Sequence, residues 1–370
     1  MKIAFDAREI FGEKTGKGNF SYHLLLELMK FDSENEYILL MQNEQNIEIP
    51  ANFKKLIVKK PSSQWHNAVR KKIKKMKPDI YFSPTSYIVP ALTKIPSVIV
   101  VPDVVSFLKV AKHQTKATLI EKLTLKRAVK NTQRIVTISE STKEDIEKLF
   151  PSAKDKIRVV YPASPLQYGC QNSDLFRVKA QAMGLPEEYV LFVGTIEPRK
   201  NVEGMIKAYA KYREMVGEEK ALPLVIVGNK GWYYDEVFKL VPKLGLSDHV
   251  IFTGYLEDEI LPCMYERARC FFFPSLYEGF GLIILEAFRY DCPVITSKIS
   301  SLPEVAGEAA EYIDPTNVDE MAKTLERVVT DRNLQNDLTQ KGRDQLKKFN
   351  WNKTAIQVLE IFTKVNEEQS

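Results

Sequence analysis

Short apolar runs alternate with helical stretches along the whole chain. Runs typical of buried strands occur in the second half at residues 189–193, 224–227, 249–252, 270–273 and 293–296. Similar runs occur in the first half at residues 2–5, 37–41, 55–58, 79–82, 97–101 and 134–138. This alternation predicts parallel sheets with helices on both faces. Since 370 residues exceed the usual size of a single core, we expect two such domains.

The chain carries one long stretch without sustained periodicity, residues 151–171, which contains Pro162, Pro165 and Gly169. We therefore expect this stretch to connect the two domains. The expected divisions are a first domain over 1–165, a second over 166–350 and a closing segment over 351–370. An amphipathic pattern from Trp351 to Val365 predicts that this closing segment is helical.

Charge is distributed unevenly between the two halves. Residues 1–170 hold 29 Lys and Arg against 17 Asp and Glu, a net charge of +12. Residues 171–370 hold 24 against 31, a net charge of −7. A basic half favours an acidic partner, either anionic lipid or a phosphate-bearing acceptor. We expect no nucleic-acid partner, because no recognised nucleic-acid motif accompanies the charge.

The four cysteines, Cys170, Cys263, Cys270 and Cys292, form no C-x-x-C pair and have no histidine nearby at ligand spacing. We therefore expect buried thiols in a reduced, cytoplasmic compartment. The first residues already have a strand pattern, so no signal peptide is expected. No apolar run approaches the ~18 residues of a membrane span, which favours a protein that is soluble or peripheral on the inner face of the membrane.

Residues 274–287 combine a strand end, a glycine loop and a helix start. The apolar run ends at Pro274, glycines follow at 279 and 281, and a pattern of good helix formers begins at Leu282. Glycines allow close approach of the backbone to a ligand, and the first N–H groups of a helix attract anions. This joint therefore predicts an anion site at the carboxyl end of the sheet, where such sheets bind ligands.

Two carboxylates, Glu278 and Glu286, belong to this joint. On a continuous helix they would lie roughly 12 Å apart, too far to act on a single bond. We expect them to serve two parts of one elongated ligand, which argues against a hydrolase dyad. The alternative is that Glu278 caps a helix and Glu286 lies at the surface.

The segment Pro274–Ala287 resembles the signature of the retaining glycosyltransferases of family 4, which have two Rossmann-like domains (the GT-B fold). The resemblance continues through Pro293-Val294-Ile295 and Leu302-Pro303-Glu304-Val305, and upstream through Val193–Asn201 and Val250–Gly254. It implies an α/β fold of GT-B type, with the two domains facing across a cleft and a C-terminal helix crossing back to the first domain. The first domain would then bind the acceptor and the second the nucleotide-sugar donor.

The resemblance also implies roles for the carboxylates: Glu278 would bind hydroxyls of the transferred hexose and Glu286 those of the ribose, since a carboxylate accepts from two adjacent hydroxyls. The sequence contains no D-x-D, so we expect no metal and no cofactor, and Arg199 and Lys200 to neutralise the diphosphate. An exposed basic loop is the alternative. Backbone N–H groups of Gly279, Phe280, Gly281 and Leu282 would assist. Further donor contacts are expected from Thr195, Tyr255 and Leu256, although packing is an equal explanation for Tyr255.

In the first half, Gly16 and Gly18 lie in a glycine loop, residues 12–18, between a strand and a helix expected from Phe20. This loop resembles the family's Gly-x-Gly near the donor diphosphate, and a flexible surface loop is the alternative. Family members commonly have His-Asp after the strand at 97–101. Here Pro102 replaces the histidine and Asp103 matches, so Asp103 stays a candidate catalytic residue, while His113 is expected to be a core or surface histidine.

Two other segments of the first half are candidates for ligand contact. Ser139 to Thr142 follow a strand end, where N-capping is favoured over substrate contact. Between Trp65 and Met76 the apolar residues share one helical face and Arg70 to Lys77 carry the basic ones. The pattern is that of an ordinary surface helix with its apolar face against the core, and its basic face could also meet anionic lipid.

The resulting hypothesis is a retaining, metal-independent hexosyltransferase that uses a nucleotide-diphosphate sugar, with a preference for GDP-mannose, and a lipid-linked or oligosaccharide acceptor in surface polysaccharide biosynthesis. A nucleotide-sugar epimerase of the same fold is one alternative. The other is an inactive nucleotide-sugar-binding subunit, suggested by Pro102. A dehydrogenase is disfavoured, because no strand is followed by G-x-G-x-x-G with an acidic residue ~20 positions on.

Overall fold

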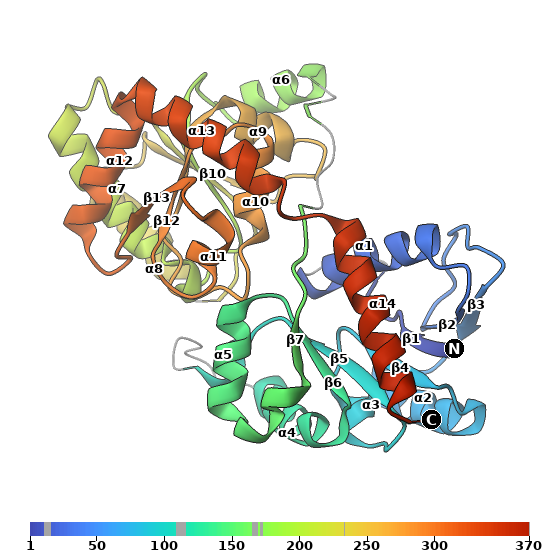
Figure 1. The fold of residues 1–370 in the computed structure, drawn as a ribbon. Coiled ribbons are helices and arrows are strands. Elements are labelled where there is room, and N and C mark those ends of the chain that lie inside the picture. The colour runs from blue at the N-terminus through green and yellow to red at the C-terminus, as the bar shows by residue number, and fades with distance from the viewer. Residues whose placement is uncertain (11–15, 109–115, 165–168, 171–172, 233, 370) are drawn as a thin grey trace. The chain divides into compact units, whose positions relative to one another are not determined.

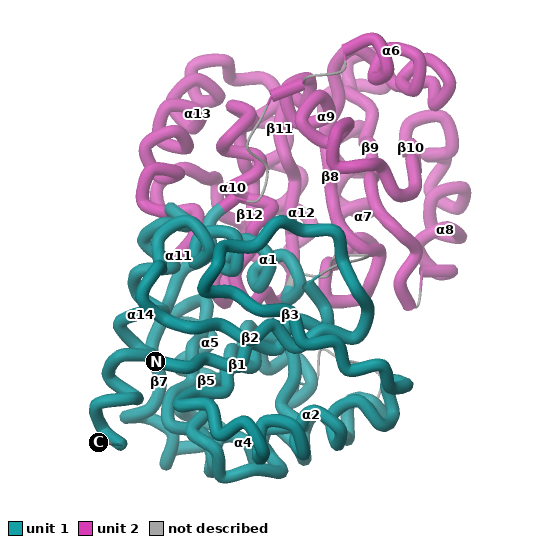
Figure 2. Tube along the Cα trace, turned by 90° about the vertical axis from the view of Figure 1, so that its right-hand side faces the viewer, with its two compact units in different colours: residues 1–108, 113–163, 350–370 teal, residues 109–112, 164–349 magenta. Residues whose placement is uncertain are grey.

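The computed structural model describes residues 1–10, 16–108, 116–164, 169–170, 173–232 and 234–369. These residues divide into two compact units, coloured separately in Figure 2. Unit 1 is built from described residues within 1–108, 113–163 and 350–370, and unit 2 from those within 164–349. Each unit contains one parallel sheet flanked by helices (Figure 1), which confirms the expected α/β fold class.

Unit 1 is centred on a seven-stranded sheet of order β3-β2-β1-β4-β5-β6-β7. All its pairings are parallel, and the middle strands are buried along their whole length, as fully covered sheets require. The strands are β1 Lys2–Asp6, β2 Glu36–Met41, β3 Phe53–Ile57, β4 Ile80–Ser83, β5 Ser97–Val101, β6 Arg134–Thr137 and β7 Ile157–Val159.

The helices of unit 1 cover this sheet with apolar faces, and the final helix closes the unit. They are α1 Gly16–Phe31, α2 Ser62–Met76, α3 Ile88–Ala91, α4 Lys116–Asn131, α5 Glu140–Leu149 and α14 Trp351–Glu367, with short 3₁₀ helices η1 Val105–Phe107 and η2 Pro151–Lys156. Trp351 stacks on His23 of α1 at 5.2 Å between ring centres, and Phe362 meets Phe82 of β4 at 5.2 Å. The closing helix therefore returns to the first unit, as predicted.

Unit 2 is centred on a six-stranded parallel sheet of order β10-β9-β8-β11-β12-β13. Its strands are β8 Tyr189–Val193, β9 Leu224–Val227, β10 Val250–Gly254, β11 Ala268–Phe273, β12 Val294–Ser297 and β13 Ala310–Ile313. Its helices are α6 Ser173–Ala182, α7 Val202–Val216, α8 Tyr234–Lys243, α9 Leu261–Arg267, α10 Leu282–Arg289, α11 Leu302–Ala306, α12 Val318–Thr330 and α13 Arg332–Leu346, with 3₁₀ helix η3 Pro198–Lys200.

Three sequence predictions about local structure need correction. The segment 151–171 is not wholly a connector, because its first residues form η2 and β7, the latter an edge strand of the first sheet. Helix α1 begins at Gly16 rather than near Phe20, so Gly16 and Gly18 lie in its first turn instead of a loop; residues 12–15 lie outside the described residues. Strand β13 was not anticipated.

Two features of unit 1 follow the sequence predictions. Trp65, Val69 and Ile73 are fully buried on the core face of α2, whereas Lys71 and Lys74 are exposed. The Ser139 side chain accepts a hydrogen bond from the Thr142 N–H and caps α5. Among the described residues, no helix is both long and apolar enough to span a membrane.

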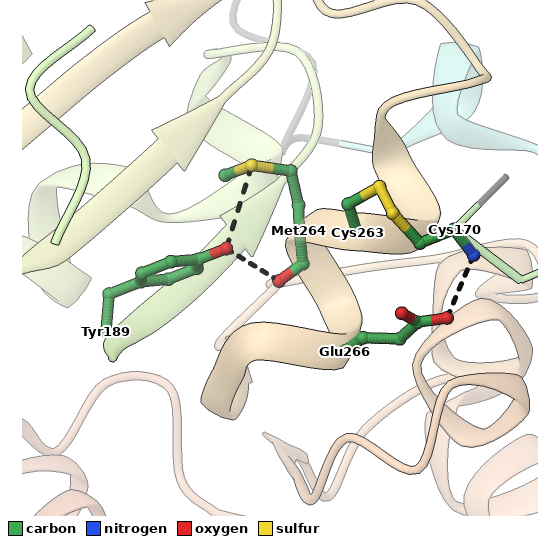
Figure 3. The surroundings of a disulfide bond; sticks show 5 residues. All are labelled: Cys170, Tyr189, Cys263, Met264 and Glu266. Atoms are coloured by element: carbon green, nitrogen blue, oxygen red, sulfur yellow. Dashed lines mark hydrogen bonds between the residues drawn. A yellow bond between two sulfur atoms is a disulfide. The ribbon is translucent and has the colours of Figure 1, made fainter. Parts of the chain in front are cut away.

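The expectation that all four cysteines are free thiols is wrong for two of them. A disulfide joins Cys170 to Cys263 on α9 (Figure 3). Cys270 and Cys292 are free and buried. The Cys170 N–H also donates to the Glu266 carboxylate at 3.0 Å. Helix α9 is thus linked to a residue 93 positions earlier in the chain.

Removing this disulfide should reduce the stability of unit 2. A cross-link that closes a loop of 93 residues restricts the unfolded chain, so Cys170→Ser should lower the free energy of unfolding by about 3 kcal/mol under oxidising conditions. Urea unfolding with and without reductant measures this effect. Cys292→Ser, which changes a buried thiol outside the cross-link, should leave the effect of reductant intact. Labelling the denatured, non-reduced protein should detect two thiols, and four would contradict the assignment.

Candidate functional site

The loops at the carboxyl ends of β8, β9 and β10 are joined by backbone hydrogen bonds. The Gly194 N–H donates to the Val227 carbonyl at 2.9 Å, and the Gly228 N–H donates to the Gly254 carbonyl at 2.8 Å. Gly228 has a φ of +145°, and a Cβ there would lie 2.1 Å from the Gly194 carbonyl oxygen. Only glycine permits this approach of two backbones, which fixes the base of the loop that carries Thr195.

Gly228→Ala should therefore destabilise unit 2 strongly. The added methyl group must displace backbone as well as adopt an unfavourable φ, so the free energy of unfolding should fall by about 3 kcal/mol or more. Gly217→Ala is a matched control, since Gly217 also has a positive φ but a Cβ there meets no atom within 4 Å. In the control, the free energy of unfolding should fall by only about 1 kcal/mol. Equal losses in thermal or urea unfolding would show that the backbone contact does not matter.

A cluster of four charges, with both carboxylates buried and both cations largely buried, lies between the β8 loop and the loop after β11. The Glu278 carboxylate accepts from Arg199 Nη1 at 2.6 Å through one oxygen and from Lys200 Nζ at 2.7 Å through the other. Arg199 also donates to Glu197 Oε1 from Nε at 3.0 Å and from Nη2 at 2.6 Å. The Lys200 ammonium lies 4.8 Å from the centre of the Phe273 ring. The two predicted cations and Glu278 are thus brought together.

Electrostatics within this cluster keep Glu278 ionised. Burial alone would raise the pKa of Glu278, but the charges of Lys200 and Arg199 outweigh burial and hold its pKa below the ordinary value. Burial lowers the pKa of Lys200, and the Glu278 carboxylate opposes that shift. With Glu197 included, the cluster carries two positive and two negative formal charges, so the cations are balanced by the protein itself.

Serine side chains hold the Glu278 loop in place. Ser275 Oγ donates to Glu278 Oε1 at 2.8 Å, and Ser301 Oγ lies 2.8 Å from the carbonyl oxygens of both Glu278 and Phe280. Helix α10 begins directly after Gly281, whose φ is +104°. The strand, loop and helix therefore occur as predicted, and the N-terminus of α10 follows the charge cluster.

Glu286 lies inside α10 and is buried, so the alternative that placed it at the surface is wrong. Its carboxylate accepts a hydrogen bond from the Tyr265 hydroxyl at 3.2 Å. Burial raises the pKa of Glu286 to about 7, although the Tyr265 hydrogen bond works in the other direction. Because α10 begins at Leu282, Glu286 is helical and Glu278 is not. The distance between the two carboxylates that was expected from a continuous helix therefore does not apply.

The remaining predicted donor contacts of unit 2 differ in exposure. Thr195 and Tyr255 are exposed in the loops after β8 and β10, whereas Leu256 is buried. Phe280 is also buried, with its ring 5.6 Å from that of Phe349 between centres. Its side chain therefore packs in the core, and only its backbone can take part in anion binding.

Three predicted residues belong to unit 1. Asp103 follows β5, and its carboxylate accepts from the Val105 N–H at 3.0 Å, which supports η1. Gly16 and Gly18 lie on either side of Lys17 in the first turn of α1, and Lys17 Nζ lies 3.2 Å from Glu121 Oε1. The nearby Tyr87 hydroxyl and the Glu121 carboxylate raise the pKa of Lys17. His113 lies outside the described residues.

Sequence reasoning missed three residues that shape the site: Glu197, Tyr265 and Ser275. Glu197 was visible as the acidic neighbour of Arg199 and Lys200, but nothing in the pattern says that it pairs with Arg199. Ser275 stands three positions before Glu278, a spacing that allows a local hydrogen bond. Tyr265 is 21 residues from Glu286 and gave no signal.

Comparison with known proteins matches most of the chain to two family models of glycosyltransferases. Residues 177–345 match the family described as Glycosyl transferases group 1, and residues 43–167 match Glycosyltransferase Family 4. The chain is 29% identical over 292 residues to O-antigen chain mannosyltransferase B of Escherichia coli, covering 76% of this chain and 74% of that protein. It is 31% identical to the serotype-specific mannosyltransferase WbdA of Escherichia coli over 62% of this chain, but spans only 29% of that protein.

Solved structures show the same fold at low sequence identity. The sucrose-phosphate synthase of Thermosynechococcus elongatus has a TM-score of 0.77 at 18% identity, with 99% of each chain covered. The lipopolysaccharide glycosyltransferase WaaG has a TM-score of 0.71 at 18% identity, covering 98% of this chain and 99% of that one. These structures and the family matches agree with the signature in residues 274–287. The chain therefore belongs to the family 4 glycosyltransferases of GT-B fold.

Proposed function

We propose that this glycosyltransferase transfers a hexose, with mannose preferred, from a nucleotide-diphosphate sugar to a lipid-linked or oligosaccharide acceptor in surface polysaccharide biosynthesis. Unit 2 would bind the donor and unit 1 the acceptor. The preference for mannose and for this biosynthetic setting is supported by relatives described as O-antigen chain mannosyltransferases. The observation that carries the proposal is the buried contact of Arg199 and Lys200 with Glu278, directly before the N-terminus of α10.

The charge balance of the cluster suggests how a donor enters. Arg199 and Lys200 are paired with Glu278 before the donor binds. The diphosphate of the donor must therefore take the place of the Glu278 carboxylate as their negative partner. We propose that Glu278 then turns its oxygens to the hydroxyls of the hexose while the cations bind the phosphates. This exchange keeps the cations paired at each stage, which avoids the cost of a buried unpaired charge.

The same groups would stabilise the leaving diphosphate. As the bond from the anomeric carbon to the phosphate oxygen breaks, negative charge grows on that oxygen, and Arg199, Lys200 and the N–H groups from Gly279 to Leu282 would bind it. The acceptor hydroxyl would bond to the anomeric carbon on the face that the phosphate leaves, and its proton would pass to the phosphate. Configuration would be retained without a protein nucleophile. The absence of D-x-D from the sequence favours these fixed cations over a metal.

Donor and acceptor screening tests this proposal. The protein is incubated with GDP-mannose, UDP-glucose or ADP-glucose and with glycan acceptors, and released nucleoside diphosphate and glycosylated product are quantified with and without chelator. We expect product only with acceptor present, most from GDP-mannose, and no effect of chelator. Donor conversion without acceptor would instead indicate an epimerase. Donor binding without product under any pair would indicate an inactive binding subunit, for which Pro102 in place of the family histidine is the motivating observation.

A further inference from the structure

One side of helix α9 is fixed to the segment before α6 and to α6 itself. Cys263 forms the disulfide with Cys170, and the Glu266 carboxylate accepts from the Cys170 N–H at 3.0 Å (Figure 3). The guanidinium carbon of Arg267 lies 4.9 Å from the centre of the Phe176 ring of α6. Since residues at i, i+3 and i+4 share one side of a helix, these three contacts hold the same side of α9.

The other side of α9 reaches the donor site proposed above. Tyr265 follows Cys263 by two positions, which is about 200° around the helix. Its ring lies 5.5 Å from that of Phe271 on β11 between centres, and its hydroxyl donates to the Glu286 carboxylate at 3.2 Å. The disulfide and the contact with Glu286 are therefore made by opposite sides of one short helix, so a shift of α9 at Cys263 moves the Tyr265 hydroxyl.

The Tyr265 hydroxyl influences the charge of Glu286. It stabilises the ionised carboxylate, whereas burial and the negative charge of Asp258 favour the protonated one, and the pKa is about 7. Tyr290, whose ring stacks on that of Tyr265 at 6.0 Å, is the other titratable group that interacts with this carboxylate. An ionised carboxylate accepts at both oxygens, which suits two ribose hydroxyls better than a protonated one does. The position of Tyr265 therefore bears directly on ribose binding.

We propose that the disulfide between Cys170 and Cys263 is a redox switch for nucleotide binding, an inference that rests on the donor role proposed for Glu286. In the oxidised protein the cross-link holds α9 so that Tyr265 reaches Glu286. Reduction to two thiols leaves this side of α9 without its covalent link, which weakens the contact of Tyr265 with Glu286 and lowers nucleotide affinity. The coupling passes through the packed side chains of one helix, and couplings between sites typically change affinity about fivefold or more.

The two cysteines differ in access for a reductant. Cys170 is partly exposed, whereas Cys263 is 1% exposed. A thiolate of a dithiol reductant would therefore attack the Cys170 sulfur, and the S–S bond would break with Cys263 leaving as a thiolate that takes up a proton. The second thiol of the reductant would then attack the mixed disulfide and release Cys170, which also takes up a proton. The cysteine pair gains two electrons and two protons, and the dithiol becomes a disulfide.

Nucleotide binding by the oxidised and the reduced full chain tests this proposal. The protein is titrated with GDP, UDP and ADP by calorimetry at pH 6.5 and pH 8, before and after reduction with dithiothreitol. We expect reduction to weaken binding of the preferred nucleotide about fivefold at pH 6.5. The effect should be smaller at pH 8, because a raised pKa of Glu286 removes a smaller share of the carboxylate charge there. Equal affinity of the two forms at both pH values would overturn the proposal.

Three variants identify the groups responsible. Cys170→Ser should bind nucleotide like the reduced protein and should not respond to dithiothreitol. Tyr265→Phe keeps the disulfide but should also bind weakly and lose the response. Tyr209→Phe is the matched control, since it removes another buried hydroxyl of unit 2, which donates to the Leu222 carbonyl at 3.0 Å, and it should respond like the unchanged protein. Circular dichroism melting checks that each variant folds, and a full response in Tyr265→Phe would contradict the proposed route through α9.

A measurement without nucleotide separates this inference from the proposed function. Urea unfolding of the oxidised and reduced proteins is compared from pH 5 to pH 7.5. A cross-link that only restricts the unfolded chain would give the same difference in stability at every pH. We expect the difference to widen as the pH rises through about 7, because reduced folded protein keeps the Glu286 proton to higher pH, and Tyr265→Phe should abolish this widening.

The two measurements have distinguishable failures. A constant difference in stability across this pH range would overturn the link from the disulfide to Glu286. A widening difference in a protein that binds none of the three nucleotides in either form would support that link and would instead overturn the donor role of Glu286, and with it the proposed control of nucleotide binding.

Discussion

Glu278→Gln should lose nearly all acceptor-dependent turnover and also unfold more easily than the unchanged protein. The substitution leaves Arg199 and Lys200, which are largely buried, with Glu197 as the remaining acidic residue of the cluster. Removing one partner from a buried ion cluster typically costs about 3 kcal/mol or more in the free energy of unfolding. Turnover should fall at least about a hundredfold, because both the hexose contact and the placement of the cations depend on this carboxylate.

A nucleoside diphosphate should partly restore the stability of this variant. The diphosphate supplies the negative charge that the substitution removes, so it should raise the melting temperature of Glu278→Gln more than that of the unchanged protein. Thermal unfolding with and without the nucleotide measures this difference, and a larger gain for the unchanged protein would contradict the assigned cation contacts. Glu236→Gln, in an exposed pair with Lys239, should alter neither stability nor turnover. Glu278→Asp keeps the charge and serves if the glutamine variant does not fold.

Glu286→Gln should have the opposite effect on stability above neutral pH. Because the pKa of Glu286 is raised from 4.5 to about 7, the folded protein binds a proton there that the unfolded chain has released between these pH values. The contribution of the protonated Glu286 to the free energy of unfolding is complete below pH 4.5 and is lost as the pH rises through about 7. At pH 8 the glutamine variant should therefore be more stable by about 3 kcal/mol.

Two measurements check this second prediction. Urea unfolding at pH values from 4 to 8 should show the curves of the two proteins converging at the acidic end, and parallel curves would contradict the shifted pKa of Glu286. Tyr265→Phe should shift the pH at which this stability is lost to a higher value, because the Tyr265 hydroxyl stabilises the ionised carboxylate of Glu286. Donor affinity of Glu286→Gln should fall about tenfold if the carboxylate binds two ribose hydroxyls, since an amide has one acceptor oxygen. Gain of stability with loss of affinity is typical of a binding-site residue.

The strands whose limits were predicted correctly are buried along their whole length. Residues 97–101 and 189–193 are apolar throughout apart from Ser97 and Tyr189, and their observed limits match the predicted ones. β7 was missed because it is three residues long and exposes Arg158 at the edge of the sheet, so it lacks a continuous apolar run. α1 begins earlier than predicted because the two glycines of its first turn weaken a helical pattern without preventing a helix.

Contacts between residues that are distant in the sequence limit how much of the site can be predicted. The glycine loop and the start of α10 are local features, so their sequence was sufficient to predict them. The pairing of Glu278 with two cations depends on how the loops after β8 and β11 meet, and the disulfide depends on two residues 93 positions apart. Spacing alone cannot determine such contacts. Glu197 shows the same limit, since a carboxylate beside two cations has several possible partners.

The return of α14 to unit 1 has a consequence for how the protein is made. Residues of the first half, including Phe82 of β4 and His23 of α1, pack against a helix that is synthesised after unit 2. During translation, the described residues of unit 2 within 164–349 emerge as one continuous stretch, whereas the hydrophobic surface of unit 1 that contacts α14 stays uncovered until α14 has left the ribosome. Unit 2 is then expected to acquire its native structure first, leaving the amino-terminal half to depend on chaperone protection in the interval.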